Sequence, residues 1–71
     1  MPNYCVNSNA QPNGDYEVHD LASTKGCLPR PVNRINLGYF ASCSGAVAAA
    51  KGRGYRTANG CAHCAPACHT R

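Results

Sequence analysis

The segment from Asn59 to His69 constrains the fold of this chain more than any other, because it holds three of the six cysteines and two of the three histidines. Cys61 and Cys64 stand in the C-x-x-C spacing, which lets two thiolates bind one tetrahedral metal ion from a tight turn. Cys68 and His69 follow directly as further potential ligands. The spacing indicates metal chemistry, although a disulfide anchor would use the same cysteines.

Chain length makes a cross-link of some kind necessary. We expect one domain over residues 1–71, and burial alone gives a domain of this size only about 3–5 kcal/mol. The N-terminal residues lack the layout of a signal peptide, and no apolar run is long enough to cross a membrane. We therefore expect a cytoplasmic protein with reduced thiols that bind Zn²⁺. A secreted scaffold with three disulfides is the alternative.

Patterning predicts an α+β fold, a three-stranded antiparallel sheet with one packed helix, stabilised by zinc or by disulfides. Strands are expected at residues 3–7, 16–19 and 35–40, with an Asn-Gly turn before the second. A helix is expected from Ser42 to Lys51, with Ser42 as its cap and Gly52 as its end.

Residue spacing within these elements predicts which side chains face the core. In the second strand Tyr16 and Val18 alternate with Glu17 and His19, so the ionisable pair lies on the other face. The helix presents one narrow face of small residues, namely Cys43, Ala46, Val47 and Ala50. Cys43 is therefore expected to be a buried, inert thiol, and Cys5 in the first strand a bystander. Gly38 marks a bulge or a close contact.

A C-x-x-C pair supplies half of a tetrahedral site, so two ligands must come from elsewhere. Cys27 is the expected third ligand, because it sits in an irregular connection after the hairpin. Cys68, near in sequence, is one candidate for the fourth. A site closed by four protein ligands leaves no position for water and is structural.

The order of motifs from His19 onward resembles the small zinc modules related to the Ada-type metal-binding domain and to nuclease-tail domains. The motifs that carry this resemblance are His19, Cys27, Asn33-Arg34 before a strand, Phe40, an alanine-rich helix, Gly54-Tyr55-Arg56 and the C-x-x-C. The resemblance implies a hairpin, a helix and a terminal C-x-x-C around zinc, with His19 as the alternative fourth ligand. The whole chain also resembles short uncharacterised bacterial proteins with Asn-Gly-Asp, Glu-Val-His, Leu-Gly, Asn-Gly-Cys-x-x-Cys and Cys-His-Thr.

Catalytic motifs are absent from the sequence: it has no triad, no paired carboxylate dyad and no phosphate-binding glycine loop. Redox-active C-x-x-C sites place the first thiol at a helix N-terminus, whereas Cys61 follows an Asn-Gly turn and Pro66 comes soon after. We expect a non-enzymatic structural or interaction module. A thiol-redox or metal-handling protein and a secreted disulfide-stapled miniprotein are the alternatives.

Charge distribution gives the only indication of a partner. The three carboxylates lie within the first twenty residues, and the seven Lys and Arg residues lie beyond them, for a formal net charge of +4. Three cations flank one aromatic ring in the segment of Lys51, Arg53, Tyr55 and Arg56. Such a segment can bind single-stranded nucleic acid weakly. The alternatives are another protein partner, or a helix end that only contacts solvent.

Overall fold

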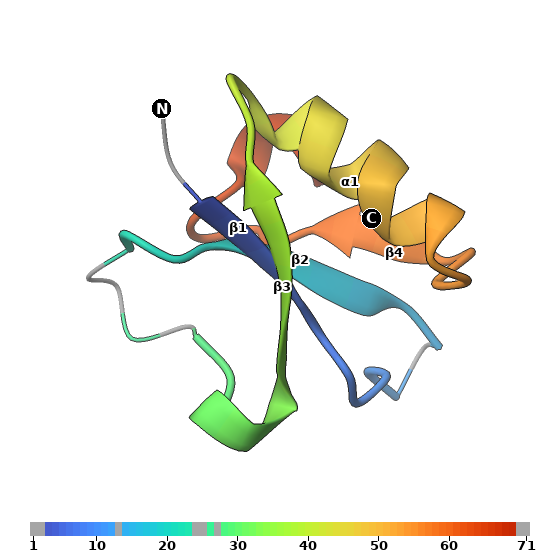
Figure 1. Cartoon of the computed structure of the whole chain (residues 1–71). Helices are drawn as coiled ribbons and strands as arrows, with labels where there is room; N and C mark the ends of the chain where they lie inside the picture. The colour runs from blue at the N-terminus through green and yellow to red at the C-terminus, as the bar shows by residue number, and fades with distance from the viewer. Residues whose placement is uncertain (1–2, 13, 24–25, 27, 70–71) are drawn as a thin grey trace.

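A four-stranded mixed sheet with one helix forms the protein in the computed structural model, which describes residues 3–12, 14–23, 26 and 28–69 (Figure 1). The elements are β1 (Asn3–Asn7), β2 (Tyr16–Asp20), the 3₁₀ turn η1 (Pro31–Asn33), β3 (Arg34–Tyr39), α1 (Cys43–Gly52), β4 (Ala58–Gly60) and the 3₁₀ turn η2 (Pro66–Cys68). The strand order is β3-β1-β2-β4. β1 pairs antiparallel with β2 and β3, whereas β4 runs parallel to β2.

The α+β class and the single helix are confirmed, but the expected sheet of three antiparallel strands is incomplete. Strand β4 was missed because its three residues, Ala-Asn-Gly, have low strand propensity. Hydrogen bonds to residues distant in the sequence hold β4 in place instead. The Thr57 hydroxyl donates to the Gly14 carbonyl at 2.7 Å, and the Asn59 side-chain amide donates to the buried Asp15 carboxylate at 3.4 Å.

The expected boundaries agree with the structure to within one residue at the strands and the helix. Ser42 occupies the N-cap position of α1, but its side chain makes no capping hydrogen bond and its Oγ lies 2.8 Å from Ser44 Oγ. The bulge at Gly38 is confirmed. Tyr4 pairs with Gly38 and Cys5 pairs with Asn36, so Leu37 is the extra residue, and Gly38 has a φ of +103°.

The core lies between α1 and one face of the sheet. Cys43, Ala46 and Ala50 of the helix are buried, as the spacing predicts, and they pack against side chains of the sheet. The sheet residues in this cluster are Tyr4, Val6, Val18 and Leu37. Small helix residues let the backbone of α1 approach the sheet closely.

The opposite face of the two central strands is also buried. Cys5 and His19 are directly paired across β1 and β2, so their side chains share a face, and they are only 0% and 1% exposed. Val6 and Val18 point to the helix side, so alternation directs Cys5 and His19 away from α1. This face therefore holds a buried thiol and a buried imidazole side by side.

A disulfide joins Cys43, at the start of α1, to Cys68 in η2. The expectation that Cys43 is a free, inert thiol is therefore wrong, although its burial is correct. Helical spacing predicts that a residue is buried but does not show which distant segment contacts it. Among the residues that the structure describes, no helix has the length and apolar character needed to span a membrane.

Candidate metal site

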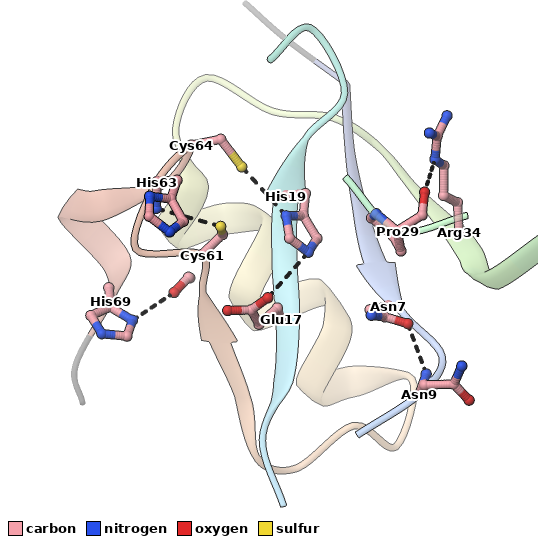
Figure 2. Close-up of polar contacts among 11 residues, drawn as sticks. Asn7, Asn9, Glu17, His19, Pro29, Arg34, Cys61, His63, Cys64 and His69 are labelled. Carbon is pink, nitrogen blue, oxygen red and sulfur yellow. Dashed lines mark hydrogen bonds and ion pairs between the residues drawn. The ribbon is translucent and has the colours of Figure 1, made fainter. Parts of the chain in front are cut away.

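Three potential metal ligands converge beside the sheet: His19, Cys61 and Cys64 (Figure 2). Each offers one donor atom, and these atoms all lie within 4.8 Å of one another. His19 and Cys61 are fully buried, whereas Cys64 is partly exposed. The group therefore combines residues that are far apart in the sequence and opens to solvent at Cys64.

Strand β4 brings Cys61 to His19. In the parallel pairing Val18 is opposite Gly60, so the next positions along the two strands are His19 and Cys61. The backbone N–H of Cys61 donates to the Val18 carbonyl at 2.9 Å and continues this ladder. Residues in register on neighbouring strands point to the same face, so the imidazole and the thiol meet there.

A tight turn brings Cys64 back to the same point. The backbone N–H of His63 donates to Cys61 Sγ at 3.4 Å. The N–H of Ala65 donates to the Cys61 carbonyl at 2.9 Å and closes the turn. The first of these bonds orients the sulfur of Cys61, and the second fixes the path of the chain through Cys64. The turn thus holds the sulfurs of Cys61 and Cys64 near one another.

Distances within the group are close to those of a loaded site. Cys64 Sγ lies 3.5 Å from His19 Nδ1 (Figure 2). In a tetrahedral zinc site, with Zn–S of about 2.3 Å and Zn–N of about 2.0–2.1 Å, this separation is about 3.6 Å. Two sulfurs in such a site lie about 3.8 Å apart. Movements of about 1 Å are thus enough to bring the whole group to coordination distance.

Electrostatics keep the His19 imidazole in the form that binds a metal. Burial lowers the pKa of His19 below its ordinary value, and the charge of Arg34 lowers it further, while Glu17 opposes both. Glu17 Oε1 lies 3.5 Å from His19 Nε2, on the ring edge away from Cys64. A neutral imidazole whose Nδ1 faces the sulfurs is a competent ligand.

Glu17 was not expected to be near a metal site. The residues sought as ligands were cysteine and histidine. A carboxylate next to the second ring nitrogen does not bind the ion itself but orients the histidine that does. The signal was nevertheless present, because Glu17 and His19 are two residues apart in a strand and so share a face.

The structure separates the cysteines expected to bind metal. Cys61 and Cys64 lie together with His19, the residue that the family resemblance implied. Cys68 does not join them, because its sulfur is bonded to Cys43, so the expectation that Cys68 is a ligand is wrong. Its position in η2 places it against the start of the helix instead. Cys27, the expected third ligand, lies outside the described residues.

The cationic segment lies at the end of α1 and in the loop that follows. Lys51, Arg53 and Arg56 are exposed, which suits contact with phosphates. Tyr55 is half-buried and packs edge-on against Tyr16, with ring centroids 5.0 Å apart. The aromatic ring is therefore partly engaged within the protein, and the surface of this segment is dominated by charge.

Comparisons of the chain with protein-family models, with curated proteins and with solved structures give no match. The resemblance to Ada-type and nuclease-tail zinc modules rests on motif order and stays a prediction.

Proposed function

We propose that this protein is a small zinc-binding structural and interaction module, in which His19, Cys61 and Cys64 bind the ion. The convergence of the three donor atoms within 4.8 Å carries this proposal. The donors come from β2 and from the turn after β4, and the register of these two strands accounts for their meeting.

The donor set favours zinc among the divalent ions common in proteins. Two thiolates and one imidazole are soft or intermediate donors, which select Zn²⁺ or Cu⁺ over Mg²⁺ and Ca²⁺. Zinc imposes no geometry of its own and accepts the tetrahedral arrangement that the His19–Cys64 separation already approaches. A donor set without carboxylates is typical of structural zinc sites.

A bound ion would act as a cross-link across most of the chain. His19 and Cys64 are 45 residues apart, and a clip that closes so long a loop removes much conformational entropy from the unfolded chain. Structural zinc sites contribute roughly 10–16 kcal/mol of apparent binding free energy, more than a core of this size supplies. The zinc-bound protein is therefore expected to be much more stable than the metal-free protein.

The test is a zinc titration of purified protein, followed by native mass spectrometry, with Co²⁺ as a spectroscopic substitute. We expect one ion per chain and the d–d absorption of a tetrahedral site. His19→Gln and Cys64→Ser should weaken binding by at least a hundredfold. The matched control is His63→Gln, an exposed histidine of the same turn.

Equal zinc affinity in His19→Gln and in the His63→Gln control would contradict the proposal. The same assay on Cys27→Ser tests the remaining ligand predicted from the sequence. The thiol-redox alternative makes a different prediction: Cys61 and Cys64 should then cycle between dithiol and disulfide, and the protein should reduce a disulfide substrate catalytically. No turnover of an insulin disulfide by the metal-free protein would argue against that alternative.

We also propose that the exposed cations after α1 are where a polyanionic partner docks. The support is the exposure of Lys51, Arg53 and Arg56, together with the confinement of all three carboxylates to the first twenty residues. Single-stranded nucleic acid fits these charges best, because phosphate contacts require only cations at the surface. Another protein with an acidic surface is the alternative partner.

A further inference from the structure

We infer that the Cys43–Cys68 disulfide regulates the metal site, so that its reduction lowers the affinity of the His19, Cys61 and Cys64 group for zinc. This inference rests on the proposed function and adds a redox control to it. Two of the candidate ligands and one half of the disulfide belong to one continuous segment, since the chain leads from Cys61 and Cys64 directly into η2, which contains Cys68.

The turn from Cys61 to Cys64, called the metal turn below, has two arms, which are its two ends. These two arms are anchored differently. On the N-terminal side, Cys61 continues β4 and is bonded to Val18 of β2, so the sheet itself holds it. On the C-terminal side, Cys64 leads into η2, which is tied covalently to α1 through Cys68. The position of Cys64 therefore depends on the attachment of η2 as well as on the hydrogen bond from Ala65 to Cys61, whereas Cys61 is held by the sheet.

Close packing transmits the position of η2 to the site. A Cβ atom placed on Gly60 would lie 2.6 Å from Cys68 Cβ and 2.7 Å from the carbonyl oxygen of Ala65. The His69 imidazole donates from Nδ1 to the Gly60 carbonyl at 3.0 Å. Gly60 directly precedes Cys61, so η2 lies against the residue that starts the metal turn. A displacement of η2 must then move at least one arm of the turn.

Reduction by thiol–disulfide exchange would release this restraint. Two equivalents of a monothiol reductant break the S–S bond, leaving Cys43 and Cys68 as thiols and the reductant as its disulfide. Without the cross-link, η2 is held only by non-covalent contacts and samples more positions. Zinc binding must then restrict that motion, and this cost appears as a lower affinity.

Thermodynamic linkage requires the effect to be reciprocal. If the disulfide raises zinc affinity by a given factor, zinc must favour the disulfide over the dithiol by the same factor. Coupling between two sites is typically 5–150-fold, and we expect about tenfold here, in the lower part of that range, because the β ladder also holds Cys61.

The experiment measures zinc affinity by competition with a chelator of known affinity, for the oxidised protein and for the double variant Cys43→Ala with Cys68→Ala. We expect the double variant to bind about tenfold more weakly. In a second arm, the unchanged protein is equilibrated with a glutathione redox buffer at fixed free zinc concentrations, and its disulfide and dithiol forms are counted by alkylation and mass spectrometry. Zinc should shift that ratio about tenfold toward the disulfide.

Several outcomes would overturn the inference. Unchanged affinity in a folded double variant would show that η2 needs no covalent anchor. Higher affinity after reduction of the unchanged protein would show that the Cys68 thiol becomes a ligand. If the double variant fails to fold, the glutathione arm decides, and a ratio independent of zinc refutes the coupling. Failure of the oxidised protein to bind zinc at all would refute the proposed function itself.

Discussion

Replacing Gly60 with alanine should destabilise the protein more than its small size suggests. The new Cβ would lie 2.6–2.7 Å from three atoms, namely Cys68 Cβ, the Ala65 carbonyl oxygen and the Cys68 carbonyl carbon. Two of these belong to the backbone, so rotation of a side chain cannot relieve the contact. Gly60 lies in β4, which pairs with β2 on one side, so η2 has to move away.

The magnitude follows from the cost of overpacking. Inserting a methyl group into a filled site costs roughly 1–3 kcal/mol, and the contacts with two backbone atoms place Gly60→Ala toward the upper end, at about 2–3 kcal/mol. For a domain of 60–100 residues each kcal/mol lowers Tm by about 4–8 °C. We therefore expect Tm of the metal-free, oxidised protein to fall by about 10–20 °C.

Differential scanning calorimetry on the oxidised protein is the assay, with urea unfolding as an independent measure. Gly52→Ala is the matched control, since a Cβ at Gly52 has no neighbour within 4 Å. That substitution lies at the last residue of α1 and should leave Tm unchanged or raise it slightly. A Gly60→Ala protein that melts within 2–3 °C of the unchanged protein, about half a kcal/mol by the same scaling, would refute the packing of η2 against β4.

Three further predictions test other parts of the structure. Cys43→Ala should cost about 3 kcal/mol in urea unfolding of the oxidised protein, because the lost cross-link spans 25 residues; a cost near 1 kcal/mol would instead fit a buried thiol without a disulfide. Because the pKa of His19 is lowered in the folded protein, the unfolded chain binds more protons than the folded chain once the pH falls below about 6.5. The metal-free protein should therefore lose stability as pH falls from about 6.5 through the lowered pKa of His19. Urea midpoints of His19→Gln should lack this component, and identical pH profiles would contradict the assignment. The double variant Arg53→Ala with Arg56→Ala should bind a labelled single-stranded oligonucleotide more weakly at low salt, and the unchanged protein should lose roughly tenfold or more in affinity between low and physiological salt. Arg30→Ala with Arg34→Ala is the control. Equal effects of the two double variants would show that the segment from Lys51 to Arg56 has no special role.

Local patterning was sufficient to predict the elements whose residues carry their own signals. Alternation of apolar and polar residues identified β2 and placed His19 on the face away from the core cluster. Small residues at helical spacing identified α1 and its buried side. Even the bulge at Gly38 followed from a glycine inside a strand pattern. In each case the pattern itself lies within residues close together in the sequence.

Features that depend on long-range contacts were not predictable in this way. Strand β4 forms because Thr57 and Asn59 bond to the chain near Gly14 and Asp15, and no local pattern marks it. The partner of Cys43 could not be chosen either, since helical spacing gives its burial but not the segment opposite. Proximity in sequence favoured Cys68 as a metal ligand, and the fold placed it elsewhere.

The sheet explains why neighbouring cysteines take different roles. Cys61 is in register with His19 on the face away from α1, whereas Cys68 joins the core cluster on the helix side through Cys43. The segment between them carries the chain from one environment to the other. Its turn is therefore restrained at one end by a β ladder and at the other by a disulfide. A metal bound by Cys61 and Cys64 would be held at the junction of these two restraints, so its affinity should respond to both. This is why Gly60→Ala, which changes no ligand, should also weaken zinc binding, whereas Gly52→Ala should not.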